Sequence, residues 1–503
     1  MPRSSKRKAA GMPETCRVHD KRQARGSKIS REKQATGLDS LPDELLLDIL
    51  DSFIIHGYYD ESRVRVLYNL CLTSRRLYRL ATPYMYAIMD NLRADPGKFL
   101  RSLIQQPEMA QSLRYLSWVD DHAEPYFWDK SKKYVLSQIE RRALCRKAEE
   151  FELINPRLYA RGFRQQQPRD HLTALLLLAP NIRRLEVADR NVCCYRRGYP
   201  TPPMWIRLLG EARFAVSPLI SQHFQHLRSL HLHMGPIKFM HIVPILGIPS
   251  LRLVVLEEVF QVVPVSSRAM EHSIPPQSSR IEEFHFENSY IGSETVAQLL
   301  RSFRGLRTFV LAFDNLERTG AYRSYEGHPP RLHYPTLAEA LLEHKDTLER
   351  LVIEEDTDWD LRDIYQLNQG SLGSLRDMHK LRSLQTGLDS FGAFEMDEYG
   401  AWFPTEPTKL SENLPLAVER VELSIEEEFY DEYEKYWRKS LDDLAQSCRS
   451  NLPNLKKVNI RRKFVDGMWI DEWLTKIRDK FAEQDIELWI MRDVETFDYI
   501  LDY

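Results

Sequence analysis

The side chains that could carry chemistry in this chain recur within one repeated six-residue pattern. The pattern is apolar-x-x-apolar-x-apolar, and glutamate or histidine often occupies its fifth and seventh positions. His231 and His233 stand two residues apart, a spacing that could chelate a metal ion, but the sequence fixes no acidic or Cys ligand beside them. His285 with Glu257 and Glu287 is better explained as a polar cluster across neighbouring strands. We therefore expect no metal site and no cofactor.

Signatures of common enzyme classes are missing from the sequence. It contains no Gly-x-x-x-x-Gly-Lys-Ser/Thr loop, no Gly-x-Gly-x-x-Gly, no Gly-x-Ser-x-Gly and no His-Glu-x-x-His. Only 20 of the 503 residues are glycine, the residue that lets backbone approach a phosphate closely. We therefore predict a protein that is not an enzyme.

The six-residue pattern occurs ten times, and repetition of L-x-x-L-x-L is the core of the leucine-rich repeat. Each copy would supply a short strand followed by a return segment that is usually helical, such as 293–303 or 336–344. The repeats predict an α/β fold with one curved, mainly parallel sheet and helices on its convex side. The alternative is an unrelated α/β domain, because no copy has the Asn or Cys ladder and the spacing is irregular. The copies start at Leu113, Ile182, Leu227, Leu251, Ile281, Leu306, Leu348, Leu381, Val418 and Leu455.

The register of the pattern predicts which side chains face the core. The fourth and sixth positions should be buried, and the fifth and seventh should face the concave surface, because side chains alternate along a strand. Residues expected in the core are Leu230, Leu232, Phe284, Phe286, Phe309, Leu311, Leu351 and Ile353. Candidate target-binding residues on the concave face are Glu186, His231, His233, Glu257, His285, Glu287, Glu354 and Glu422.

Glutamate dominates these concave positions, and Arg461 is their one basic residue. We expect an acidic face that attracts a target protein with a basic segment, the alternative being ordinary solvated strand residues. Two acidic stretches with aromatics, 354–360 and 426–433, follow predicted strands and could grip a basic peptide, although solvated loops are the simpler interpretation. Nucleic acid is disfavoured, because only the N-terminal tail is strongly basic.

Residues 41–89 predict a pair of apolar helices. Leu41 should be extended because it precedes Pro42, which suits the first turn of a helix. The first helix has one apolar stripe, Leu45, Leu46, Ile49, Leu50 and Phe53, and the second helix runs through Leu67 to Leu80 and is closed by Pro83. Two short helices cannot cover this much apolar surface, so we expect a partner.

This segment resembles the F-box, a helical module that docks onto the Skp-type adaptor of cullin-RING (SCF) ubiquitin ligases. The alternative is an ordinary helical hairpin, since Leu77 stands where an aromatic is common and 54–63 looks like an insertion. The resemblance rests on Leu41-Pro42, Glu44-Leu45, Ile49-Leu50, Leu72–Leu77 and Ala81–Tyr86. It implies adaptor binding through Leu41, Pro42, Leu45, Ile49, Leu50, Leu77 and Pro83.

An F-box followed by degenerate leucine-rich repeats resembles the F-box/leucine-rich-repeat proteins of filamentous fungi. The resemblance implies the substrate-recognition subunit of an SCF ubiquitin ligase, which would bind the adaptor, through it the cullin, and a target protein through the repeats. The alternative is a repeat scaffold that binds proteins without recruiting a ligase.

Length and charge divide the chain into segments with different properties. The 503 residues allow two or three domains. We expect a disordered basic tail at 1–37, an F-box at 38–90, a helical connector with the first repeat strand at 91–165, and the repeat domain at 166–503. The net charge is −3, yet residues 1–37 hold eleven Lys/Arg against three Asp/Glu, so the remaining chain is strongly acidic.

The tail and the composition also bear on location. The clusters Lys6-Arg7-Lys8 and Lys21-Arg22 resemble a two-part nuclear import signal, although a merely solubilising tail explains them equally well. No apolar run reaches 18 residues, so no contact with a membrane is expected. The six cysteines form no Cys-x-x-Cys pair, which favours a reducing compartment. We expect the protein in the nucleus, the cytoplasm or both.

Overall fold

The structure of the protein is a computed structural model. It describes residues 37–53, 61–120, 136–165, 168–189, 201–214, 218–235, 237–261, 270, 274–312, 332–354, 370–392, 394–396, 402–404, 408–426, 431–463 and 472–493. Residues 1–36 of the predicted tail, residues 54–60 of the suggested insertion and most of the two acidic stretches lie outside these residues.

The described chain begins with a small helical unit, which we define as residues 38–85. Leu41 is extended, with φ −73° and ψ 145°, as predicted for a residue before proline. Asp43 begins the next helix and places its carboxylate at the positive end of the helix dipole. The unit consists of η1 (Leu38–Ser40), α1 (Asp43–Ser52), α2 (Glu61–Thr73) and α3 (Arg75–Met85).

The prediction of a single second helix closed by Pro83 is wrong. The helix is divided at Ser74, whose hydroxyl caps α3 by accepting the Leu77 N–H at 3.2 Å. Pro83 lies inside α3, which continues to Met85. Pro83 has no backbone N–H, so one intrahelical hydrogen bond is missing near the C-terminal end of α3.

The helical unit has a small hydrophobic core of its own. The Tyr84 hydroxyl donates a hydrogen bond from this core to the Asp51 carboxylate at 2.9 Å, and burial together with that bond raises the pKa of Tyr84 to about 12. Few side chains fill the core, so much of the apolar surface of the three helices remains outside it. The core consists of Leu46, Leu50, Leu67, Leu77, Leu80, Ala81 and Tyr84.

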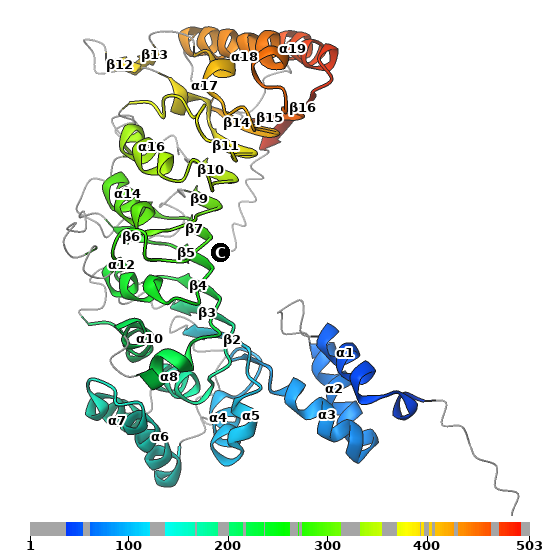
Figure 1. Ribbon diagram of the computed structural model, residues 1–503, viewed down its shortest axis with the longest axis vertical. Coiled ribbons are helices and arrows are strands. Elements are labelled where there is room, and N and C mark those ends of the chain that lie inside the picture. The colour runs from blue at the N-terminus through cyan, green and yellow to red at the C-terminus, as the bar shows by residue number, and fades with distance from the viewer. Residues whose placement is uncertain are drawn as a thin grey trace, which may run out of the picture.

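The rest of the described chain is built on one parallel sheet. Its strands lie side by side in chain order, and Figure 1 shows them stacked along an arc with most helices on the outer side. The described residues contribute twelve strands to this sheet: β1 (Ile88–Asp90), β2 (Tyr115–Asp120), β3 (Arg184–Asp189), β4 (Ser229–His233), β5 (Leu253–Glu257), β7 (Glu283–Glu287), β9 (Thr308–Ala312), β10 (Arg350–Glu354), β11 (Ser383–Gly387), β14 (Arg420–Glu426), β15 (Lys457–Lys463) and β16 (Glu487–Asp493).

All ten copies of the pattern form strands of this sheet, as predicted, but two strands were missed. β16 lacks the first apolar residue of the pattern, because Asp485 stands there with a left-handed backbone, φ 57°. β1 is only three residues long, too short for a periodic signal, and it pairs with β2 through Ile88 and Tyr115. The sheet therefore begins inside the range 38–90 that was expected to be F-box.

The strands are connected mainly by helices. Those predicted at 293–303 and 336–344 correspond to α14 and α16. The described helices beyond the helical unit are α4 (Pro96–Gln105), α5 (Pro107–Ala110), α6 (Gln138–Glu150), α7 (Pro156–Gln165), α8 (Pro168–Leu178), α10 (Met204–Phe214), α11 (Pro218–His223), α12 (Phe239–Ile242), η3 (Val243–Gly247), α14 (Ser293–Ser302), α16 (Tyr334–Leu342), η6 (Leu388–Phe391), α17 (Leu410–Asn413), α18 (Asp431–Asn451) and α19 (Glu472–Glu483).

In the part of the chain that the structure describes, two short strand pairs lie apart from the main sheet. They are the parallel pair β6 (Phe260–Gln261) and β8 (Tyr290–Ile291), and the antiparallel pair β12 (Phe394–Met396) and β13 (Trp402–Pro404). No described helix combines the length and the apolar content that a membrane crossing requires.

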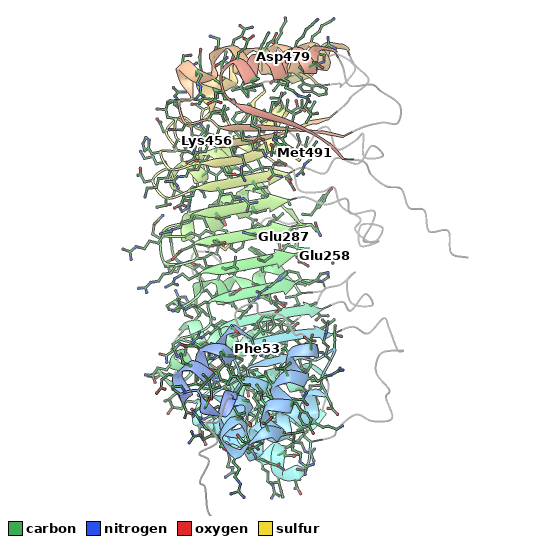
Figure 2. The ribbon with its side chains drawn as sticks, turned by 90° about the vertical axis from the view of Figure 1, so that its right-hand side faces the viewer. Phe53, Glu258, Glu287, Lys456, Asp479 and Met491 are labelled. Carbon is green, nitrogen blue, oxygen red and sulfur yellow. The ribbon has the colours of Figure 1, made fainter. Side chains whose placement is uncertain are left out.

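The predicted register of the repeats is confirmed. All eight residues expected in the core, from Leu230 to Ile353, are at most 1 % exposed. Glu186, His231, Val255, His285 and Val310 are consecutive partners on neighbouring strands and lie on the other side of the sheet. We call that side the open face, and it points toward the viewer in Figure 2.

Candidate functional site

Two surfaces hold the residues predicted to bind partners: the open face of the sheet and the outside of the helical unit. On the open face, His231 of β4 lies between two glutamates of the neighbouring strands. Its Nε2 is 2.7 Å from Glu257 Oε1, and its Nδ1 is 3.9 Å from Glu186 Oε1. Its interactions with the carboxylates of Glu186 and then Glu257 raise the pKa of His231 to about 9, so the imidazole is protonated at neutral pH.

Glu186 has further partners on the same face. The Tyr115 hydroxyl and the Arg184 guanidinium both donate hydrogen bonds to its carboxylate. Burial would raise the pKa of Glu186, but the hydrogen bonds from His231, Tyr115 and Arg184 outweigh it and lower this pKa to about 2. The negative charge of Glu186 is therefore permanent and balanced by its neighbours.

Arg461 of β15 neutralises two more of the predicted glutamates. Its Nη1 donates to Glu354 Oε1 at 2.9 Å, and its Nη2 donates to Glu422 Oε1 at 2.7 Å. Asn459 adds a hydrogen bond to Glu422 at 3.1 Å, and Gln385 donates one to Glu354. Both carboxylates are thus engaged within the sheet.

The other two histidines predicted on the open face, His233 and His285, each lie beside a different glutamate. His233 Nε2 lies 3.1 Å from Glu258 Oε1, and His285 Nδ1 lies 3.4 Å from Glu287 Oε1. Part of the predicted cluster of His285, Glu257 and Glu287 is present: Glu257 and Glu287 are register partners and His285 contacts Glu287, while the Glu257 carboxylate also contacts His231. No group of three or more His, Cys, Asp or Glu side chains in the described part of the chain is arranged to hold a metal ion.

Arg461 is the one basic residue among the fifth and seventh positions, but further basic residues lie on the same face at the third position of the pattern. The third position of each pattern copy has the same parity as the fifth and seventh, and it was left out of the prediction. Several of these third positions are basic, and the period-two rule applied from the start of each strand would have found them. They are Arg184, Arg350, Arg420 and Lys457. The open face therefore carries both acidic and basic side chains.

The helical unit presents a different kind of surface. Leu45 and Ile49, one turn apart on α1, are 49 % and 42 % exposed. The expected single stripe of α1 is divided, because Leu46 and Leu50 turn inward to the small core. Other large apolar side chains of this unit are exposed too: Leu38, Val66, Tyr68, Leu72 and Tyr78.

Not all predicted adaptor residues lie on that surface. Leu50 and Leu77 are each only 2 % exposed, because they fill the core that joins α1 to α3. Pro42 is exposed, and Leu41 is half-buried against the core. Arg76 of α3 fixes the start of α1, because it donates hydrogen bonds to the Leu41 carbonyl at 2.6 Å and to the Asp43 carboxylate at 2.7 Å.

Pro83 faces the sheet region. It lines a groove of about 420 Å³ between α3 and the beginning of the sheet. Leu47 and Arg79 line the groove on the helical side, and Arg114 and Asn181 line it on the other. Pro83 is therefore placed at the junction between the two regions.

The chain matches no known protein-family model and no curated protein.

Proposed function

We propose that the protein is a non-catalytic receptor subunit of an SCF-type ubiquitin ligase, with the helical unit as an F-box that binds a Skp-type adaptor and, through it, a cullin. The observation that carries this proposal is the exposed apolar surface of the unit. Seven of its large apolar side chains are exposed within fewer than fifty residues. Solvated apolar side chains at this density mark a binding surface for another protein.

The order of the strands supports the second half of the proposal, an irregular leucine-rich-repeat solenoid that holds a target. Each copy of the six-residue pattern forms one strand, and successive strands are direct neighbours. Such stacking leaves one long face of the sheet open for a protein partner. The charges of this face are of both signs and mutually paired, so they do not favour a basic segment over other targets.

The test removes apolar surface from α1. Leu45 and Ile49 are replaced together by alanine in the full chain, and binding of a purified fungal Skp-type adaptor is measured by calorimetry. Burying a large apolar side chain contributes about 1.5–3 kcal/mol, so half-exposed residues should together contribute enough to weaken binding at least about tenfold.

A matched control removes exposed apolar groups elsewhere. Ile139 of α6 and Ile154 after it are also strongly exposed, and the double variant Ile139→Ala with Ile154→Ala should bind the adaptor as the wild type does. Wild-type protein that fails to bind the adaptor would leave only a scaffold that recruits no ligase. Equal loss in both double variants would show that the contact is not specific to α1.

A further inference from the structure

The sheet has a charged edge where its strands begin, and the sequence prediction did not consider it. The second position of each pattern copy lies at this edge, the one on which Lys456 is labelled in Figure 2. We call these second-position residues the rungs of the edge. Neighbouring rungs are joined by backbone hydrogen bonds, such as Arg228 N–H to Arg183 O at 2.8 Å and Arg307 N–H to Glu282 O at 2.7 Å. Successive side chains along this edge are therefore about 4.8 Å apart.

The order of positive and negative side chains differs between the two halves of this edge. The first four rungs are all arginine, and from the fourth onward the sign alternates. Glu282 lies 3.4 Å from Arg252 and 3.9 Å from Arg307, and Glu419 lies 2.6 Å from Lys456. In chain order the rungs are Arg114, Arg183, Arg228, Arg252, Glu282, Arg307, Glu349, Arg382, Glu419 and Lys456.

A hollow of about 370 Å³ opens in the alternating part of the edge. Three cations in its lining, Arg280, Arg304 and Lys380, are exposed and have no ion-pair partner among the residues that the structure describes. Arg307 contributes a fourth, because its contacts with Glu282 and Glu349 are long, 3.9 and 4.0 Å. Arg252 is already engaged by Glu282 and by the carbonyls of Pro249 and Leu251.

We propose that this hollow binds a phosphorylated side chain of a partner polypeptide. The cations that line the hollow outnumber its two carboxylates, Glu282 and Glu349, and this excess suits a phosphate dianion, which accepts several charge-assisted hydrogen bonds at once. A continuous polyanion such as nucleic acid fits less well, because Glu282, Glu349 and Glu419 interrupt the edge on alternate rungs. The site is separate from the proposed adaptor surface and does not depend on ligase recruitment.

Gly305 provides a way to fill the hollow without disturbing the fold. It lines the hollow, and a Cβ atom added to it would meet no other atom within 4 Å. Gly305→Glu therefore introduces a carboxylate at the site with no steric conflict near the backbone. Charge removal at Arg280 and Arg304, both exposed, should likewise leave the fold intact.

The experiment uses the full chain and a peptide library with a central phosphoserine, compared with the same library carrying serine or glutamate there. We expect the wild type to bind the phosphorylated library at least about tenfold more tightly than either of the others. Arg280→Ala with Arg304→Ala, and separately Gly305→Glu, should each remove that preference. The control Arg183→Ala with Arg228→Ala removes two cations of the same edge outside the hollow and should change binding less than about twofold.

Four results would overturn the proposal. No preference for phosphoserine over serine would show that the hollow is not a phosphate site, and equal binding of the glutamate library would show a general acidic-peptide surface. Equal loss in the control variant would show an attraction spread along the whole edge. The fourth result is competition by nucleic acid. If a single-stranded RNA oligonucleotide displaced the phosphorylated library when added at the same concentration as that library, the edge would be assigned to nucleic acid.

Discussion

The helical unit and the sheet region differ in how many of their large apolar side chains are exposed to solvent. Among its described residues, the unit buries seven apolar side chains and leaves as many large apolar side chains exposed, among them Leu45, Tyr68 and Leu72. The sheet region is several times longer, yet among its described residues the exposed large apolar side chains are only Leu92, Ile139, Ile154, Leu219, Leu416 and Trp489.

The difference follows from geometry. Three short helices enclose little volume, so each can turn only part of its apolar surface inward. A sheet with helices along one side buries one full face of every strand, and the other face can be polar throughout. Regions of one chain can therefore offer a partner either apolar surface, as the helical unit does, or charged surface, as the sheet does.

The sharpest test of the contrast uses two neighbouring residues of α1. Leu50→Ala removes a side chain from the small core and should destabilise the helical unit by about 2–5 kcal/mol. Ile49→Ala removes an exposed side chain and should change that stability by less than about 0.5 kcal/mol. Amide hydrogen exchange of α1–α3 in the full chain measures both, with the strands of the sheet as an internal reference. Similar effects of the two variants would mean that the core is misassigned.

A second prediction concerns pH and the charged open face. The pKa of His231 is raised to about 9 in the folded chain, against about 6.5 when unfolded, so its stabilising contribution is complete below pH 6.5. That contribution is lost as the pH rises through about 9, and the sheet should lose roughly 1–3 kcal/mol of stability over this range. Denaturant unfolding of the wild type and His231→Gln at several pH values measures the change.

The same titration compares the two regions. The described residues of the helical unit include no histidine, so hydrogen exchange in α1–α3, corrected for its intrinsic pH dependence, should report little change in stability between pH 6.5 and 9. His231→Gln should flatten the response of the sheet. A response as steep in this variant as in the wild type would place the titrating group elsewhere.

The smallest effect is expected at the edge where the strands begin. Lys456 donates a hydrogen bond to Glu419 at 2.6 Å, and this bond lowers the pKa of Glu419, but the Lys456 side chain is 72 % exposed and the Glu419 side chain 37 % exposed. Solvent screens such a pair, so Glu419→Gln should leave the unfolding temperature unchanged within error. A decrease as large as that of His231→Gln would contradict the distinction between the edge and the partly buried open face.

Much of the sheet could be predicted from the sequence alone. Residues such as Leu230, His231 and Leu232 alternate with period two, and a strand in one register has only one way to bury its apolar side. The extended Leu41 before Pro42 was predictable for a similarly local reason. The strand around Trp489 was missed because its first apolar position is occupied by Asp485.

The candidate sites depended on contacts between distant parts of the chain. Leu45 and Leu46 are both apolar and both at helical spacing, and only the packing of α2 and α3 decides which one is buried. The Arg461 guanidinium reaches Glu354, 107 residues earlier, across the strands that lie between them. The hollow around Arg304 exists because separate repeats bring their first residues to one edge. Local periodicity determined the strands and their register, whereas the pairing of charges and the exposure of apolar groups were decided by tertiary packing, since they depend on which neighbours the fold brings into contact.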